Sequence, residues 1–190
     1  IHAYNEALSL KPNFAEAHNN KGIALQTLGR LEEAEASYKQ AIALKPDFAG
    51  AHYNSGIIFQ EQGRTAEAEA SYTEAIRLEP DYAEAHNNLG AALQEIGRLD
   101  EAEASYMRAL ALKPDYAEAH RNLAITRKFD AKDEQYSKML ELYLDENISA
   151  EQRCHINFGL AKACEDFEDF GQALSHYNEG NCLRKQLLDY

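Results

Sequence analysis

The sequence predicts an all-α fold, a solenoid of antiparallel helix pairs, from two observations. The segment Ala83–Tyr116 recurs almost unchanged when it is shifted back by 34 residues to Ala49–Tyr82, and by 34 again to Ala15–Phe48. All four prolines of the chain keep this register, because each lies 34 residues after the one before it. A fixed period of this length indicates a repeat architecture. Repeats bury their core against their neighbours, so the 190 residues do not need two globular domains.

Each copy of the repeat has the pattern of two helices joined by a tight turn. In the third copy, Asp81 is a good N-cap residue, and Glu84 three positions later completes a capping-box pattern. Gly97 supplies the left-handed conformation in which helices commonly end, so a second helix over about residues 99–112 follows. Pro114 cannot continue that helix, and the chain turns into the next copy. We expect the same capping box at Asn13–Glu16 and Asp115–Glu118.

Small residues at fixed places indicate where the two helices of a repeat meet. Gly90 lies in mid-helix, where glycine costs about 1 kcal/mol relative to alanine. Gly22 and Gly56 hold the same place, so a tolerated accident is a poor explanation. We expect these glycines to allow close contact with the second helix at Ala34, Ala68 and Ala102. The residues that supply bulk to each core are Tyr38, Tyr72 and Tyr106.

This pattern resembles the tetratricopeptide repeat family. The residues that carry the resemblance are Gly90, Gly97, Ala102, Tyr106, Ala109 and Pro114, and they recur in the two preceding copies. The resemblance implies a right-handed superhelix whose first helices line a concave groove. In the family that groove usually holds a peptide or an extended chain.

The repeats divide the chain into six segments. Residues 1–14 match the second helix of a truncated repeat, so we expect the chain to be part of a longer protein. Three full repeats follow at 15–48, 49–82 and 83–116. An irregular unit at 117–148 and a divergent C-terminal repeat at 149–190 complete the chain. The helices expected in these last two segments are Ala117–Phe129, Ala131–Leu144, Ala150–Asp166 and Gly171–Leu188, with a capping box at Ser149–Gln152.

The tail carries a second resemblance. The segment HINFGLAKACEDFEDFGQALSHYNEGN, within about residues 129–185, looks like the region that joins the repeats to the catalytic domain in bacterial tetratricopeptide-repeat sulfotransferases. The resemblance implies that the parent protein continues into a sulfotransferase fold. A sulfotransferase needs a loop for its phosphate-bearing cofactor, and this chain has no glycine-rich phosphate loop.

Composition excludes several classes of function. A formal net charge of −13 argues against nucleic acid and anionic membrane surfaces, since both require a basic surface. No apolar run reaches the ~18 residues of a membrane-spanning helix. The three cysteines form no CxxC pair, which favours free thiols in a reducing compartment and predicts a cytoplasmic location. We find no catalytic constellation, and we expect neither a cofactor nor a metal, because one histidine per repeat cannot converge on an ion.

The candidate site is a row of asparagines, one in each first helix. They are Asn20, Asn54, Asn88 and Asn122. Asparagine is a poor residue for a helix interior because its amide competes with the backbone. A similar row occurs in the repeats of O-linked N-acetylglucosamine transferases, where it binds the backbone of a polypeptide, and the resemblance implies the same role here. Duplication that copied asparagine without selection is the alternative explanation.

Other residues are expected to surround this row. The preceding positions differ between repeats, which suits side-chain selectivity, although neutral drift on a solvated face explains the variation as well. Those positions hold Asn19, Tyr53, Asn87 and Arg121. Ile23, Ile57 and Ile125 would add apolar surface, and Gln26, Gln60 and Gln94 further amides. Lys128 and Arg121 are the basic residues near this face, too few for a clamp on a ligand carboxylate.

Three functions follow from these patterns. The favoured one is a non-catalytic interaction module that binds an extended polypeptide in its groove through the asparagine ladder. The second is a substrate-recruiting arm of a larger enzyme, a sulfotransferase before a glycosyltransferase. The third is self-association, because the truncated helix at residues 1–10 exposes an apolar face on which another copy could stack.

Overall fold

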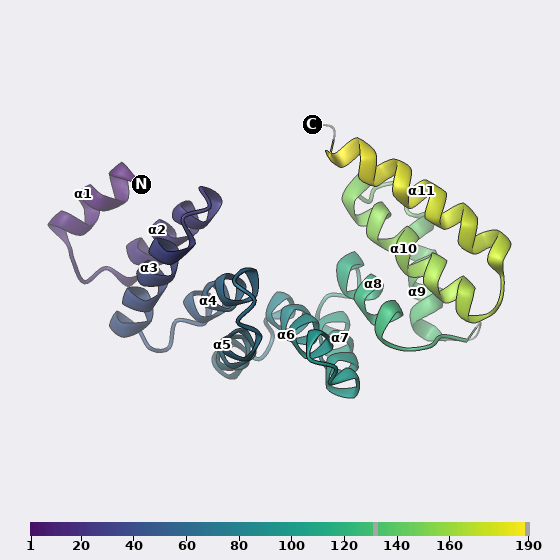
Figure 1. Ribbon diagram of the computed structural model, residues 1–190, viewed down its shortest axis with the longest axis horizontal. Helices are drawn as coiled ribbons and strands as arrows, with labels where there is room; N and C mark the ends of the chain where they lie inside the picture. The colour runs from purple at the N-terminus through teal and green to yellow at the C-terminus, as the bar shows by residue number, and fades with distance from the viewer. Residues whose placement is uncertain (131–132, 189–190) are drawn as a thin grey trace. The chain divides into compact units, whose positions relative to one another are not determined.

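The computed structural model describes residues 1–130 and 133–188, and these form helices and no strand (Figure 1). The all-α class predicted from the sequence is therefore confirmed. The helices are α1 (His2–Leu10), α2 (Ala15–Thr27), α3 (Leu31–Leu44), α4 (Ala49–Glu61), α5 (Thr65–Leu78), α6 (Ala83–Glu95), α7 (Leu99–Leu112), α8 (Ala117–Thr126), α9 (Glu134–Leu144), α10 (Ala150–Asp166) and α11 (Phe170–Leu188).

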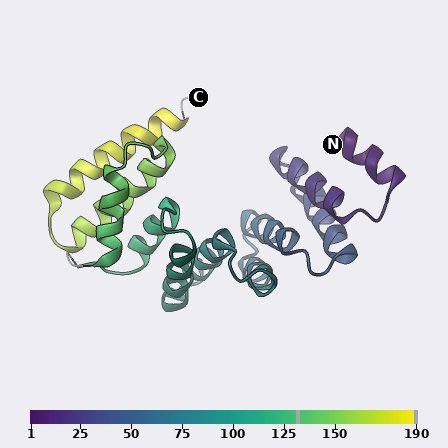
Figure 2. The ribbon, with the colours of Figure 1, turned by 180° about the vertical axis from the view of Figure 1, so that it is seen from behind.

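The chain divides into two compact units, each of which is built from packed helix pairs. Unit 1 spans Ile1–Ile96 and contains α1 to α6, and unit 2 begins at Gly97 and contains α7 to α11. In unit 1, α2 packs on α3 and α4 on α5, while α3 also meets α4 and α5 meets α6. In unit 2, α10 packs on α8, α9 and α11, and both views show α10 and α11 side by side (Figures 1 and 2).

The core of unit 1 repeats from one helix pair to the next. Leu25, Ala34 and Tyr38 of the first pair are buried together with Ile58, which belongs to the following helix α4. The next cluster has the same plan, with Ala92 of α6 closing the group formed by Phe59, Ala68 and Tyr72. Each repeat thus completes the core of the repeat before it, as expected for a one-dimensional stack.

The mid-helix glycines lie against the second helix of the repeat, as predicted, but their nearest neighbours there are tyrosine rings and not the alanines. A Cβ built on Gly22 would lie 2.5 Å from Cε1 of Tyr38, and its three nearest atoms all belong to that ring. Gly56 and Tyr72 have the same arrangement, again at 2.5 Å. The ring reaches the glycine because it is far larger than the alanine side chain and fills the space between the helices. Glycine at these places is therefore a steric requirement of the tyrosine.

The expected capping boxes at the first helices of the repeats are wrong by one residue. Helices α2, α6 and α8 begin after Phe14, Tyr82 and Tyr116, with no side-chain cap. A turn closed by a backbone bond, such as Tyr82 N–H to the Glu79 carbonyl at 3.1 Å, places the aromatic residue at the N-cap. Asp81 therefore precedes the N-cap by one residue.

The predicted glycine turns between paired helices are confirmed. Gly29, Gly63 and Gly97 have φ values of 70°, 71° and 80°. In unit 2 the same turn is made by Glu168, with φ of 64°. Its backbone bonds follow the pattern at Gly29: Glu168 N–H donates to the Glu165 carbonyl, and Asp169 N–H to that of Cys164.

We expect Glu168→Gly to raise the free energy of unfolding by about 0.5–1 kcal/mol, because glycine adopts this conformation without the steric cost of a Cβ. Urea unfolding followed by circular dichroism measures the change. Glu168→Ala is the control, since it removes the charge and keeps the Cβ. Equal gains for the two variants would contradict the backbone explanation.

The C-terminal helices match the prediction closely, except at α8. Helix α8 ends at Thr126 and not at Phe129, because the chain becomes extended at Arg127 and buries the Phe129 ring. The Phe129 N–H then donates to Oδ2 of Asp166 at 3.1 Å. Helix α9 begins at Glu134, and the start predicted for it at Ala131 lies outside the described residues. The capping box at Ser149 and Gln152 is present.

Candidate functional site

The four asparagines of the predicted row lie on the first helices of their repeats. Asn20, Asn54 and Asn88 stand on α2, α4 and α6 of unit 1, and Asn122 stands on α8 of unit 2. Helix α4 contacts both α2 and α6. We call Asn20, Asn54 and Asn88 the rung asparagines. Asn20 is exposed and the other three asparagines are half-buried, so each keeps part of its amide accessible.

Hydrogen bonds between neighbouring repeats hold the rung asparagines in place. Asn54 Nδ2 donates to Oδ1 of Asn19 at 3.0 Å, and Asn88 Nδ2 donates to the hydroxyl of Tyr53 at 3.3 Å. Both bonds join residues 35 apart, so each connects one repeat to the next. We call Asn19 and Tyr53 the anchors. They restrict the rotamers of Asn54 and Asn88.

The anchors are packed between repeats and do not lie on open surface. The exposed fraction of Asn19 is 7%, and that of Asn87, at the equivalent place on α6, is 0%. The Tyr53 ring is half-buried, with its centroid 4.8 Å from that of Tyr82 and 6.0 Å from that of Tyr72. Asn19 Nδ2 and Asn87 Nδ2 also donate to the adjacent rung oxygens, of Asn20 at 3.4 Å and Asn88 at 3.2 Å. These residues are therefore placed to hold the rung asparagines, and direct contact with a ligand side chain is secondary.

The glutamines expected on the same face are partly used by the core. The Tyr38 hydroxyl donates to Oε1 of Gln26 at 3.0 Å, and the Tyr72 hydroxyl donates to Oε1 of Gln60 at 2.8 Å. Burial raises the pKa of both tyrosines well above its usual value, so these hydroxyls stay protonated donors. Each glutamine thus satisfies the polar end of a buried ring.

Apolar side chains lie one turn after the rungs. Ile23 is 44% exposed on α2, and Ile57 on α4 is half-buried against the core that contains Tyr72. Ile125 on α8 of unit 2 is 48% exposed. The two exposed isoleucines have apolar surface that the folded units do not cover.

The basic residues of the predicted site lie in unit 2. Arg121 on α8 is half-buried, and its Nη1 donates to Nδ1 of His155 on α10 at 3.3 Å. This bond requires the neutral ring, and burial together with the Arg121 charge lowers the pKa of His155. Lys128 is exposed beyond the end of α8. The Arg121 guanidinium therefore connects α8 to α10, and Lys128 is not part of this contact.

Burial also lowers the pKa of His120 and of His176, which lie in unit 2 like His155. A histidine with a folded pKa below its unfolded value of about 6.5 binds more protons in the unfolded chain, so stability is lost as the pH falls. We expect the free energy of unfolding to decrease from about pH 7 to pH 5. His120→Gln, which retains a donor for the Pro114 carbonyl, should weaken this dependence. Urea unfolding at several pH values provides the measurement, and an identical slope in the variant would contradict it.

The repeated histidines hold the turns between repeats. In each case Nε2 lies 2.9–3.0 Å from the carbonyl oxygen of the proline six residues earlier. The four are His18, His52, His86 and His120. This confirms a role at the helix start. Across residues 1–130 and 133–188, no group of histidine, cysteine, aspartate or glutamate side chains could hold a metal ion.

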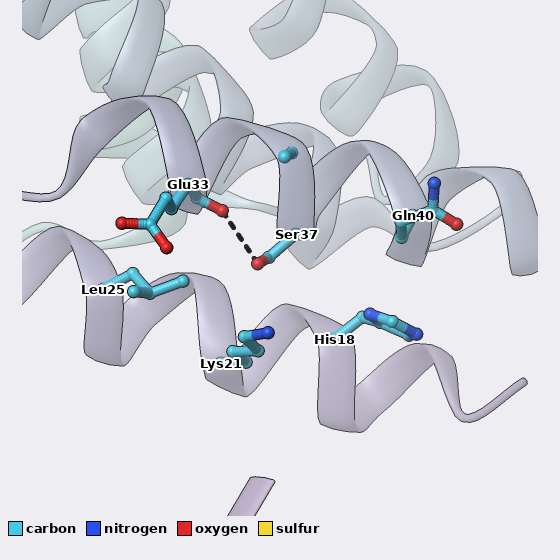
Figure 3. A pocket seen from close by; sticks show the side chains of 7 residues that line it. His18, Lys21, Leu25, Glu33, Ser37 and Gln40 are labelled. Carbon is cyan, nitrogen blue, oxygen red and sulfur yellow. Dashed lines mark hydrogen bonds between the residues drawn. The ribbon is translucent and has the colours of Figure 1, made fainter. Parts of the chain in front are cut away.

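A crevice of about 240 Å³ lies between α2 and α3, and none of the rung asparagines lines it (Figure 3). Its walls include Lys21 and His18 on α2 and Glu33 and Ser37 on α3. The Ser37 hydroxyl donates to the Glu33 carbonyl at 2.8 Å, as the dashed line shows. Because that hydroxyl is engaged with its own helix, the crevice does not present an activated nucleophile.

The cysteines are free: Cys154 and Cys164 are buried, and Cys182 is exposed. No helix within the described residues is long and apolar enough to span a bilayer. The cytoplasmic location predicted from the thiols stays a prediction.

Helix pairs that repeat every 34 residues, and in which each pair closes the core of the one before it, define an α-helical repeat protein. Comparison with family models identifies the repeat. One tetratricopeptide repeat model matches residues 53–117 and again residues 92–126, and a second matches residues 3–36. A model described as a TPR repeat matches residues 27–63. Through these residues the chain belongs to the tetratricopeptide repeat family.

Solved structures of the same fold include proteins with bound or inferred peptides. YrrB, described as a TPR protein with an unusual peptide-binding site, matches at a TM-score of 0.71 and 20% identity over 96% of this chain and 93% of its own. The first TPR of Spaghetti (RPAP3), bound to the HSP90 peptide SRMEEVD, matches at 0.58 and 27% over 59% of this chain and 89% of its own.

An enzyme is also among the similar structures. A mutant O-GlcNAc transferase of Thermobaculum terrenum matches at a TM-score of 0.59 and 25% identity, over 68% of this chain and 25% of the enzyme chain. The comparison with curated proteins finds no match.

Proposed function

We propose that this chain is a non-catalytic interaction module that binds an extended polypeptide along the rung asparagines of unit 1. One observation carries the proposal: at Asn54, the anchor Asn19 engages a single N–H of the rung amide. Within the described residues, the Asn54 carboxamide has a single hydrogen bond, donated by Nδ2 to Asn19. Its Oδ1 and second N–H are available, and a carboxamide can pair with both the N–H and the C=O of a peptide.

The spacing of the helices fits an extended ligand. Packed helices lie about 8–10 Å apart, and an extended chain rises about 3.3 Å per residue. One rung would therefore meet about every third ligand residue. The peptide-binding site of YrrB and the HSP90 peptide bound to the Spaghetti TPR support a polypeptide as the ligand. Asn122 on α8 is proposed to bind in the same way in unit 2.

Side-chain preference would come from residues beside the rungs. Ile23 and Ile57 offer apolar contact in unit 1, and Arg121 and Lys128 offer charge in unit 2. In this proposal Asn19, Tyr53 and Asn87 act through the rungs, because they are buried or half-buried between repeats.

The test is a peptide screen with the whole chain, followed by affinity measurements on a variant with alanine at Asn20, Asn54 and Asn88. Three lost bonds of about 1 kcal/mol each predict a decrease of about 100-fold. The variant should stay folded with unchanged helical content, and its stability should decrease by no more than the loss of two bonds between repeats, about 1 kcal/mol each. The control is alanine at the exposed asparagines Asn5, Asn178 and Asn181, which should bind as the wild type does. Unchanged affinity in the rung variant would refute the ladder.

A substrate-recruiting arm of a larger enzyme is the second candidate function. The Thermobaculum terrenum O-GlcNAc transferase favours it, since this chain matches a quarter of that enzyme's chain. The resemblance of the tail to sulfotransferase proteins makes a sulfotransferase our preferred parent. Sequencing the gene beyond Tyr190 tests this, because a strand, a phosphate-binding loop and a helix should follow.

Self-association is the third candidate, carried by the exposed surface of α1. No residue of α1 is buried, and Leu10 is 88% exposed. Stacking of another copy on this helix would cover it. A molar mass that does not change with concentration in light scattering would exclude this function.

A further inference from the structure

The face of unit 1 that carries the rung asparagines has a row of carboxylates and no cation. On a helix, residues at i, i+3 and i+7 share a face. Each rung is therefore followed along its helix by an aliphatic residue and then by the last residue of the helix. The three stripes are Asn20–Ile23–Thr27, Asn54–Ile57–Glu61 and Asn88–Ala91–Glu95. The charged residues of these stripes are Glu61 and Glu95, both exposed.

The Glu61 carboxylate is held in place and is not neutralised. Gln26 Nε2 donates to its Oε1 at 2.8 Å, a bond that joins α2 to α4. Its negative charge contributes to the raised pKa of Tyr38 and Tyr72, after burial in both cases. Among the described residues, neither Glu61 nor Glu95 forms an ion pair. Their charge is therefore available to a ligand.

The nearby arginines of unit 1 are already paired elsewhere. Arg64 binds Glu35 and Glu67, with its guanidinium over the Phe59 ring at 4.3 Å. Arg30 binds Glu33 of α3 at 2.7 Å. Lys21 lies in the crevice between α2 and α3 (Figure 3). These pairs keep positive charge away from the rung face.

Helix polarity adds to the negative potential. Thr27, Glu61 and Glu95 are the last residues of α2, α4 and α6. The carbonyl ends of helices carry partial negative charge and favour cations. The two carboxylates and the helix ends therefore both make the electrostatic potential of this face more negative.

We propose that the polypeptide bound along the rung asparagines is basic, with Lys or Arg at about every third residue, so that its side chains meet Glu61 and Glu95 while its backbone pairs with the rungs. This inference rests on the proposed function. An acidic ligand would place its carboxylates against Glu61 and Glu95 with no cation to receive them.

The test uses the whole chain and three labelled peptides of about twelve residues, long enough to cross three rungs. They repeat Lys-Ser-Thr, Gln-Ser-Thr or Glu-Ser-Thr. The lysine peptide should bind about tenfold more tightly than the glutamine peptide at low salt, and the difference should shrink as salt screens the charges. The glutamate peptide should bind more weakly than either.

The variant Glu61→Gln with Glu95→Gln should remove the preference for the lysine peptide. Its control, Glu32→Gln with Glu79→Gln, changes the net charge equally at exposed residues outside the three stripes and should keep the preference. Equal binding of the lysine and glutamine peptides, or a preference that survives in the first variant, overturns the basic ligand and leaves the ladder intact. Failure of all three peptides to bind, or binding unaffected by alanine at the rungs, overturns the proposed function as well.

Discussion

A Gly56→Ala variant is expected to lose about 2 kcal/mol of folding free energy, although alanine is the better helix former. The added Cβ would lie 2.5 Å from Cε1 and 2.7 Å from Cδ1 of Tyr72. The ring is fully buried, and its hydroxyl is bonded to Gln60, so it cannot turn away. Overpacking against a fixed ring costs about 3 kcal/mol, and helix propensity returns about 1 kcal/mol. Urea unfolding followed by circular dichroism measures the difference.

Gly50→Ala is the matched control, because it lies on the same helix α4. The nearest atom to its added Cβ is Cε2 of Phe48 at 3.4 Å, an ordinary contact. We expect this variant to keep its stability or to gain about 0.5 kcal/mol. Combining Gly56→Ala with Tyr72→Leu should recover part of the loss, since the smaller side chain vacates the ring position. Equal effects of Gly50→Ala and Gly56→Ala would contradict the steric account.

Much of the fold could be predicted from the sequence because repetition shows which features a repeat requires. A single glycine in a helix is ambiguous, whereas Gly22 and Gly56 in register indicate a shared cause. Its partner was still misassigned, since spacing along a helix gives the face of a residue and not the neighbour that fills the space. The nearest atoms to Gly22 across the helix pair belong to the ring of Tyr38 and not to Ala34.

Local chemistry misled the prediction at helix starts. Asp81 and Glu84 have the spacing of a capping box, but the turn closed by Tyr82 N–H shifts the helix start by one residue. Where no such turn competes, at Ser149, the same pattern predicted the cap correctly. The capping rule holds, therefore, only when the preceding backbone leaves the candidate residue at the N-cap.

The sequence aligned the asparagines of the candidate site, but it did not show which side chains contact them. The period of 34 aligns Asn20 with Asn54, but it contains no information on which side chains meet between repeats. The bonds from Asn54 to Asn19 and from Asn88 to Tyr53 follow a spacing of 35. Variation at the anchor positions suggested contact with a ligand. In the structure, the amide of Asn19 and the phenol of Tyr53 both accept a hydrogen bond from a rung N–H.

Removing both anchor groups is expected to weaken peptide binding although the rung residues themselves are unchanged. Asn19→Ala and Tyr53→Phe together delete the acceptors for Asn54 and Asn88, two bonds of about 1 kcal/mol each, and predict a loss of about 30-fold in affinity. The rung amides would then sample several rotamers, and binding would have to order them again. Calorimetric titration of a peptide that the wild type binds gives the affinity and shows the cost as a less favourable entropy.

Tyr38→Phe is the control, because it deletes a hydroxyl bonded to Gln26 and leaves the acceptors for Asn54 and Asn88 unchanged. It should bind within a few-fold of the wild type even if its stability decreases by about 1 kcal/mol. An anchor variant that binds normally would mean that the rungs need no support from the preceding repeat. A variant that binds weakly, with the rung residues intact and the urea midpoint unchanged, would show that the contacts between repeats organise the amide row before the ligand arrives.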